Sequence, residues 1–285
     1  MLLEGNLTGF QHLGIPVTNI GNAKQWYVDI LGFEIIHEPE IDTPEGAIRL
    51  AFLQRQDIIL EFYQLVGDDL EEVKQRAHGH IDHFAIDVLN VQSALDEVTK
   101  KGANLSPETP DGPVGIPQFW PKGVEYFFLT ASNGEKVEFN RRLDLDQKRR
   151  ENNINGWSHL GIPVTDIHRS EVFYQQFGFD KVMQAVIPVE DQEIKASMMM
   201  FNDFTLEFYQ LLPADLEDIR MRKDGFIDHV ALDVRDINQA FEELKTAGIS
   251  PLEDEPVELP FWENGVKYFF VRGPDGEKIE FNQVL

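Results

Sequence analysis

The chain has 285 residues, a length typical of two domains of ordinary size. Apolar residues make up 42% of it, which fits a globular protein, and the absence of cysteine excludes disulfides, thiolate metal ligands and a cysteine nucleophile. The net charge of −25 at pH 7 argues against nucleic acid and anionic lipid as partners, because both bind mainly through Lys and Arg.

The sequence also lacks the features of an exported or membrane-anchored chain. No stretch approaches the roughly 20 apolar residues of a membrane span, and the first residues, Met-Leu-Leu-Glu-Gly-Asn, form neither a basic nor an apolar signal region. We therefore expect a cytoplasmic protein that acts on a small-molecule substrate, as a monomer or a homodimer.

The two halves of the chain repeat the same segments in register, with an offset that stays between 142 and 147 residues. The repeated segments include His-Leu-Gly-Ile-Pro-Val-Thr at 12–18 and 159–165, Leu-Glu-Phe-Tyr-Gln-Leu at 60–65 and 206–211, and Ile-Asp-His at 81–83 and 227–229. Such a repeat predicts duplicated domains. We assign them to residues 1–146 and 147–285, joined across the charged stretch 144–155.

Each half divides again into two modules that share one order of elements. The modules span about residues 8–66, 80–143, 156–212 and 226–285. Each opens with a histidine and an alternating apolar run, and then has a helix-like segment that ends at a glycine, at 23–31, 91–101, 170–177 and 237–247. Short strand-like runs follow and end in Glu-Phe. The pattern predicts an α+β fold of four β-α-β-β-β modules, which form two domains with curved mixed sheets.

The alternation within the strands places the histidines and glutamates on one face. Leu13, Ile15 and Val17 form the apolar face of the first strand, which leaves His12 on the opposite face. The same parity applies at His12, Glu61, His83, Glu138, His159, Glu207, His229 and Glu280. Two modules side by side would bring together two imidazoles and two carboxylates, which suit a divalent ion of Zn, Ni, Co, Mn or Fe. A single such position is more often a polar niche or a wet strand end, but eight coincident positions favour metal sites, with no organic cofactor.

These residues and their order resemble the vicinal-oxygen-chelate superfamily, which includes glyoxalase I, methylmalonyl-CoA epimerase, extradiol dioxygenases and antibiotic-resistance proteins. The resemblance covers nearly the whole chain and implies paired βαβββ modules. Glyoxalase I is the most similar member, because its metal is held by a His, Glu, His and Glu set. The corresponding sets here are His12, Glu61, His83 and Glu138 in the first half and His159, Glu207, His229 and Glu280 in the second.

The resemblance also implies a reaction. It implies a lyase, isomerase or epimerase that acts on a small α-hydroxycarbonyl or related substrate through a metal-stabilised enediolate. One glutamate of each set would act as the base, and the sequence does not indicate which; the candidates are Glu61, Glu138, Glu207 and Glu280.

Two other functions within the superfamily are alternatives. An extradiol ring-cleaving dioxygenase uses two His and one Glu on iron, and a resistance-type protein binds a small molecule without metal ligands. The complete His/Glu set in both halves favours the lyase or isomerase. Glutathione is not expected in the substrate: bacterial glyoxalase I has an Arg four residues after its first His and an Asn four residues after its first Glu. This chain has Pro16 and Leu65 at those places, and Pro163 and Leu211 in the second half.

Three further groups are candidates for substrate contacts, each with a simpler alternative. Two Phe-Trp pairs in corresponding Pro-flanked loops either line a pocket or dock on the core. Two tyrosines on the ligand face either donate to a bound oxyanion or only cover the sheet. Two corresponding cations either meet an anionic group or lie on a solvated strand face. These residues are Phe119, Trp120, Phe261 and Trp262 in the loops, Tyr63 and Tyr209, and Arg49 and Lys195.

The sequence leaves open which modules share a metal. The linkers inside each half, 66–80 and 212–226, resemble the connection in epimerase-like members, where consecutive modules build one site. We therefore expect pairing within each half. The alternative couples the first module with the fourth and the second with the third, and the linker between the halves, 141–156, is of similar length and allows it.

Overall fold

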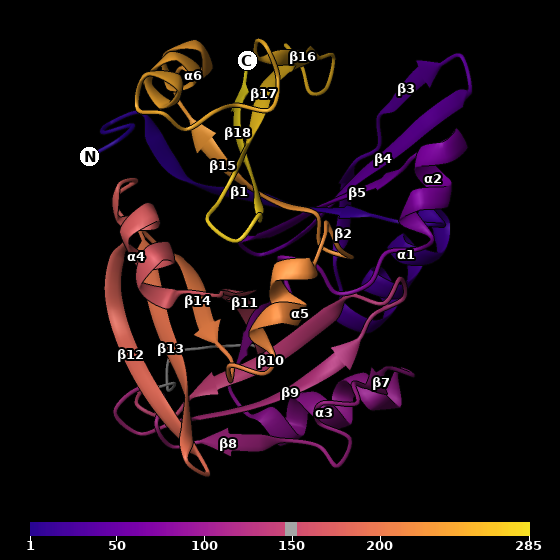
Figure 1. Ribbon diagram of the computed structural model, residues 1–285. Helices are drawn as coiled ribbons and strands as arrows, with labels where there is room; N and C mark the ends of the chain where they lie inside the picture. The colour runs from indigo at the N-terminus through magenta and orange to yellow at the C-terminus, as the bar shows by residue number, and fades with distance from the viewer. Residues whose placement is uncertain (146–152) are drawn as a thin grey trace.

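The structure is a computed structural model that describes residues 1–145 and 153–285 (Figure 1). Within these ranges the chain forms two nine-stranded sheets with short helices packed on them, which confirms the predicted α+β fold of βαβββ modules. The predicted boundary between 146 and 147 lies outside the described residues, as does most of the charged junction. None of the described helices has the length and hydropathy that a membrane span requires.

The first sheet combines strands from the two ends of the chain. Its order is β16-β17-β18-β15-β1-β5-β4-β2, with β3 paired to β4. The N-terminal strands are β1 (Leu7–Pro16), β2 (Glu34–His37), β3 (Glu40–Thr43), β4 (Gly46–Arg55) and β5 (Ile58–Gln64). The C-terminal strands are β15 (His229–Val234), β16 (Val257–Leu259), β17 (Val266–Arg272) and β18 (Lys278–Val284).

The second sheet is built from the middle of the chain. Its order is β12-β13-β14-β11-β6-β10-β9-β7, with β8 paired to β9. One part has β6 (His83–Val88), β7 (Asn104–Leu105), β8 (Val114–Ile116), β9 (Val124–Thr130) and β10 (Lys136–Arg142). The other has β11 (Ile154–Pro163), β12 (Asp180–Val189), β13 (Gln192–Phe201) and β14 (Phe204–Gln210).

One helix of each module begins at a side-chain cap that the sequence supplies. Asn19, Asn90, Asp166 and Asp236 each accept a hydrogen bond from the backbone N–H three residues on, which satisfies a donor that the first turn leaves free. The helices are α1 (Ile20–Trp26), continued by a π-helical turn (Tyr27–Leu31), α3 (Val91–Lys100), α4 (Ile167–Gln175) and α6 (Ile237–Thr246). The linkers carry α2 (Gly67–Val73) and α5 (Leu216–Met221).

The modules exchange partners between the two halves of the chain. β1 of the first module runs antiparallel to β15 of the fourth, with Gly14 opposite His229, and β6 of the second runs antiparallel to β11 of the third, with Gly161 opposite His83. The predicted pairing within each half is therefore wrong. The alternative arrangement, first with fourth and second with third, is the one observed.

The two linkers within the halves explain this exchange, because each carries the chain from one sheet into the other. They cross where Phe226 N donates to Ala77 O at 3.0 Å, and an isolated bridge joins Ile81 to Ile227. Only glycine fits at the crossing: a Cβ on Gly79 would lie 2.3 Å from the backbone nitrogen of Gly225. After β5 the chain therefore leaves the first sheet and enters the second sheet with β6.

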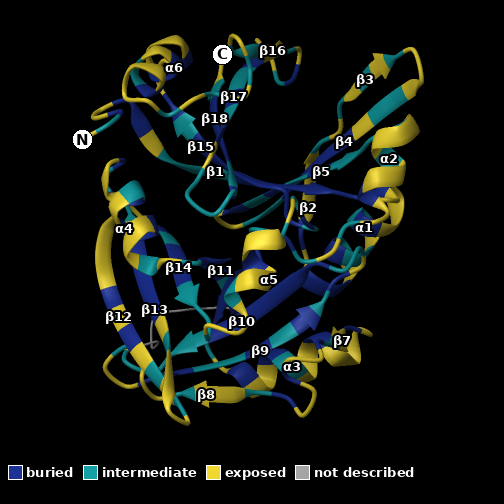
Figure 2. Cartoon of the chain, in the orientation of Figure 1, coloured by how far each residue is buried: buried dark blue, intermediate teal, exposed yellow. Residues whose placement is uncertain are grey.

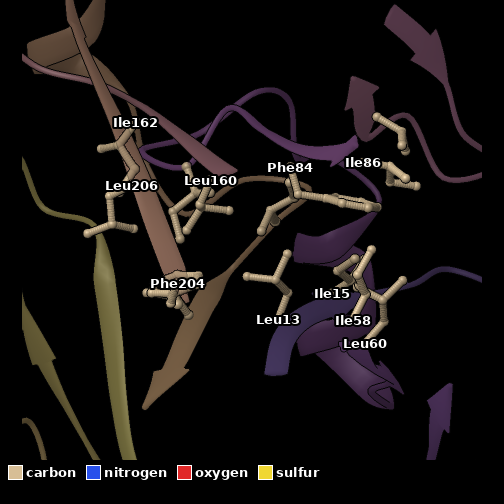
Figure 3. Close-up of a cluster of buried hydrophobic side chains, with 14 of the residues drawn as sticks. Leu13, Ile15, Ile58, Leu60, Phe84, Ile86, Leu160, Ile162, Phe204 and Leu206 are labelled. Atoms are coloured by element: carbon tan, nitrogen blue, oxygen red, sulfur yellow. The ribbon is translucent and has the colours of Figure 1, made fainter. Parts of the chain in front are cut away.

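A single buried cluster joins the two sheets and contains residues of all four modules. Figure 3 shows Leu13 and Leu60 of the first module near Phe84 of the second and Leu160 of the third. The predicted core face of β1 is confirmed, because Leu13, Ile15 and Val17 are all fully buried. In Figure 2 the buried residues fill the centre of each sheet, whereas the exposed ones lie on the helices and at the outer ends of the hairpins. The central strands thus bury one face in the core, which leaves their other face to carry polar side chains.

Candidate functional site

The first cluster consists of His12, Glu61, His229 and Glu280, which lie on the four central strands of the first sheet. His12 Nε2 lies 3.4 Å from Glu61 Oε2, and His229 Nε2 lies 3.6 Å from Glu61 Oε2 and 3.3 Å from Glu280 Oε2. The two Nε2 atoms are 3.2 Å apart. Two imidazoles and two carboxylates therefore converge on one small volume.

The second cluster consists of His83, Glu138, His159 and Glu207 and repeats this geometry in the second sheet. His83 Nε2 lies 3.2 Å from Glu138 Oε2, and His159 Nε2 lies 3.2 Å from Glu207 Oε2. One donor atom of each of the four residues lies within 4.8 Å of the others. In the first cluster the same holds for His12, His229 and Glu280, while Glu61 contacts both histidines. The structure thus brings together all eight residues expected from the sequence, but in sets that mix the two halves.

Strand register explains why these side chains meet. β5 runs parallel to β1 with Glu61 beside Gly14, and β18 runs parallel to β15 with Glu280 beside Ala231. Small residues opposite the ligands make room for the rings: a Cβ on Gly14 would lie 1.9 Å from Cε1 of His229. The glycine in the repeated His-Leu-Gly-Ile-Pro-Val segment is therefore required by the histidine of the partner module.

An aspartate positions one histidine of each cluster. Asp228 Oδ2 lies 3.1 Å from His229 Nδ1, and Asp82 Oδ2 lies 3.1 Å from His83 Nδ1. Each carboxylate is held in turn by a lysine, at 2.7 Å from Lys278 and 2.6 Å from Lys136. These residues were not predicted from the sequence, although the Asp precedes the His in both Ile-Asp-His segments. A carboxylate on Nδ1 fixes the ring and its tautomer, as is usual for metal-binding histidines.

The groups of each cluster shift one another's pKa values strongly. Burial alone lowers the pKa of His159, but Glu138 and Glu207 outweigh it and raise that pKa to about 9. Burial opposes ionisation of Glu207 as well, yet His159 and His83 bring its pKa below the usual range. In the first cluster burial raises the pKa of Glu280, an effect that His12 and His229 offset only in part. The buried carboxylates therefore favour a positively charged partner.

Each cluster lies at the base of a cavity. The four residues of the first cluster line the first cavity, of about 330 Å³, and those of the second cluster line the second cavity, of about 270 Å³. Two of the predicted substrate residues line the first cavity, Tyr63 and Phe261, and their counterparts Tyr209 and Phe119 line the second. An enclosed polar cluster below apolar walls is the usual form of a small-molecule site.

The other predicted substrate residues do not line the two cavities, although Trp262 and Trp120 pack behind residues that do. Trp262 stacks on His37 with ring centroids 4.6 Å apart, and the guanidinium of Arg142 lies 3.4 Å from the ring centre of Trp120. Arg49 pairs with Glu40 at 3.3 Å on an exposed strand, and Lys195 is exposed on β13. For these two cations the structure agrees with the simpler interpretation, a solvated strand face.

Comparisons with known proteins agree with this architecture. Models of the Glyoxalase/Bleomycin resistance protein/Dioxygenase superfamily match residues 9–119 and 158–280. Among solved structures, glyoxalase I from Zea mays is 18% identical, with a TM-score of 0.69 over 96% of this chain and 92% of its own. A putative dioxygenase from Bacillus subtilis is 12% identical, with a TM-score of 0.64 over 98% of this chain and 86% of its own.

A curated relative matches part of the chain. The uncharacterised protein YwbC of Bacillus subtilis is 29% identical over 125 residues, which is 44% of this chain and 94% of the relative. Because their identities are low, the two solved structures support only the fold, whereas the family models support membership of the superfamily. With both halves matched by models of one superfamily, the chain belongs to the Glyoxalase/Bleomycin resistance protein/Dioxygenase superfamily, also called the vicinal-oxygen-chelate superfamily, in a tandem two-domain form.

Proposed function

We propose that the chain is a metal-dependent lyase or isomerase of glyoxalase type, acting on a small α-hydroxycarbonyl or related substrate, with one divalent ion in each cluster. The convergence of two imidazoles and two carboxylates at the base of a cavity is the observation that carries this proposal. The same set argues against an iron dioxygenase, which typically uses two histidines and one carboxylate.

The donor set fits a divalent ion of Zn, Ni, Co, Mn or Fe. Asp228 on Nδ1 of His229 keeps the proton on that nitrogen, which leaves the Nε2 lone pair directed into the first cluster. Gln11 Oε1 accepts a hydrogen bond from Nδ1 of His12 and in the same way leaves the Nε2 lone pair of His12 free for the cluster. Each pair of glutamates would balance the charge of a divalent ion.

The carboxylates of each cluster differ in how they are held, and this difference indicates which glutamate would act as the base. Asn282 Nδ2 donates to Glu280 Oε1 at 3.2 Å, and Asn140 Nδ2 donates to Glu138 Oε1 at 2.8 Å. At the position two residues after Glu61 the chain has Tyr63, whose hydroxyl faces Asp228 instead. Glu280 and Glu138 are thus oriented by an amide, whereas Glu61 and its counterpart Glu207 have more freedom to leave the cluster.

The reaction follows from these roles. A divalent ion would supply a Lewis acid for the substrate's vicinal oxygens. Glu61, or Glu207 in the second cluster, removes the proton from the hydroxyl-bearing carbon next to the carbonyl and returns it to the carbonyl carbon, while the hydroxyl proton passes to the former carbonyl oxygen. The apolar walls, with Phe52 and Phe261 in the first cavity, exclude water and strengthen electrostatic interactions at the cluster.

The experiment measures α-proton exchange in D₂O by NMR on the full chain, after loading in turn with each of the five metals. The substrates are small α-hydroxyketones and, for the arm with glutathione, the hemithioacetal that it forms with methylglyoxal. We expect exchange without glutathione, and a loss of about 10²-fold or more in the Glu61→Gln, Glu207→Gln double variant. Oxygen consumption with a catechol and Fe²⁺ would instead favour the ring-cleaving dioxygenase. Tight binding without exchange or oxygen consumption would favour a sequestering protein.

A further inference from the structure

The walls of the two cavities indicate which substrates they admit. We propose that both cavities select substrates whose non-reacting part is apolar and carries no negative charge. This inference rests on the proposed function, because it concerns the same two sites. The position and pairing of the cations support it, as does the composition of the walls.

The cations of the first cavity are already engaged by acidic side chains. Among the described residues that line it, the cations are Arg76 and Lys278. Arg76 lies 2.6 Å from Asp228 and 2.9 Å from Glu72, and Lys278 lies 2.7 Å from Asp228 and 3.3 Å from Asp224. A substrate carboxylate would have to compete with two acidic partners of each cation.

The second cavity repeats this arrangement. Lys136 is the cation on its described lining, and its Nζ lies 2.6 Å from Asp82 and 3.3 Å from Glu108. Asp82 also receives Arg222 at 3.4 Å, from the linker of the other half. Lys136 therefore holds Asp82, which in turn positions His83, and the lysine is not free to bind an anion.

Hydrocarbon makes up most of the remaining wall above each cluster. Leu65 and Leu211 occupy equivalent places in the two cavities, each four residues after a cluster glutamate. Other apolar lining residues include Ile41, Ile48, Leu50, Phe52, Phe261 and Val266 in the first cavity and Ile116, Phe119, Val124, Ile187, Ile194 and Met198 in the second. An anionic group there would lose water without gaining a cation.

The acidic residues on the cavity linings also provide no site for an anionic group. Besides the cluster glutamates, the first cavity is lined by Asp228 and the second by Asp82. A divalent ion would be balanced by the two glutamates of its cluster. Because both aspartates are already paired with cations, a negative charge on the substrate body would find no free cation in either wall.

Three aromatic hydroxamates test the proposal by binding alone. Each carries the same pair of vicinal oxygens: benzohydroxamate, its 4-carboxamide and its 4-carboxylate. Calorimetry on the zinc-loaded full chain gives their dissociation constants, and titration against free zinc corrects for intrinsic differences in chelation. We expect the carboxamide to bind within a few-fold of the parent and the carboxylate to bind about tenfold more weakly, or worse. The carboxamide separates the effect of charge from that of size.

A charge-introducing variant tests the cause of this selectivity. Leu65 and Leu211 are partly exposed, so the Leu65→Lys, Leu211→Lys double variant places an unpaired cation in each wall. It should improve carboxylate binding about tenfold. The matched Leu65→Met, Leu211→Met variant should not.

The outcomes separate this inference from the proposed function. Equal affinity for the carboxamide and the carboxylate would overturn the inference and leave the proposed function standing. Selective binding of the uncharged probes by a protein that shows no α-proton exchange would support the inference and overturn the proposed function. Failure of every probe to bind the zinc-treated chain would overturn both.

Discussion

Glu277 is a buried carboxyl that joins the two sheets, and it provides a stability test that is independent of any metal. Its Oε1 accepts a hydrogen bond from the hydroxyl of Tyr174 at 3.1 Å, and its Oε2 accepts one from the backbone of Asp275 at 3.0 Å. Tyr174 lies in the third module and Glu277 in the fourth, so this contact links the helix of one sheet to a turn of the other. The side chain is completely buried. Burial outweighs the hydrogen bonds and raises the pKa of Glu277 from 4.5 to about 7.

The size of the effect follows from the difference between the folded and unfolded chains. In the unfolded chain the carboxyl ionises near its ordinary pKa of 4.5, whereas the folded chain holds the proton up to a pKa of about 7. The stabilisation is therefore fully present below pH 4.5 and is lost as the pH rises through 7. Since one pKa unit corresponds to about 1.36 kcal/mol, this group lowers the free energy of unfolding by about 3 kcal/mol across that window.

Glu277→Gln removes this ionisation. Glutamine keeps one acceptor of the two, so the variant should lose about 1 kcal/mol at pH 4.5. At pH 8 it should be more stable than the parent by about 2 kcal/mol, because the parent must hold a buried charge or protonate it there. Urea unfolding of both chains at the two pH values, with chelator present, gives this difference, and Glu242→Gln on the exposed face of α6 is the control. A difference between Glu277→Gln and its parent that does not change with pH would show that ionisation of Glu277 does not destabilise the folded chain.

Three further predictions concern the clusters. Asp228→Asn should weaken metal binding at the first cluster about 10- to 100-fold and leave the second unchanged, with Asp82→Asn giving the converse, as measured by competition with a chromophoric chelator. Gly14→Ala should displace His229 and abolish metal binding at the first cluster, since the added Cβ would lie 1.9 Å from the ring. Gly21→Ala is the control, because its added Cβ would meet its nearest contact at 3.4 Å. Equal metal content in the two variants would contradict this prediction. A chain with metal present at 100 times Kd should have a free energy of unfolding about 2.7 kcal/mol higher per site than the metal-free chain. An unchanged melting temperature after metal removal would argue against metal binding to the folded chain.

The sequence predicted the faces of the strands well, because a period of two is a local property. Leu13 and Ile15 against His12 define the core face and the ligand face of β1 without any knowledge of its neighbours. The same local pattern could not reveal which strand lies beside β1. That choice depends on the path of the linkers, and the glycines that let them cross, Gly79 and Gly225, have no distinctive local pattern.

The roles of residues that support the ligands could not be predicted from the sequence either. Asp82 was visible in the Ile-Asp-His segment, but its role depends on the ring nitrogen it faces and on Arg222 from a distant linker. Arg49 and Lys195 correspond under the repeat, yet correspondence alone does not direct a side chain into a cavity. Long-range packing decides these positions.

The metal content of two double variants tests whether each cluster combines modules from opposite halves. His12→Ala, His229→Ala removes two ligands of the first cluster, whereas His12→Ala, His83→Ala removes one ligand from each cluster. After loading with zinc and dialysis against a weak chelator, we expect about one ion per chain in the first variant and almost none in the second. The opposite result, about one ion with His12→Ala, His83→Ala and almost none with His12→Ala, His229→Ala, would show that each half builds its own site.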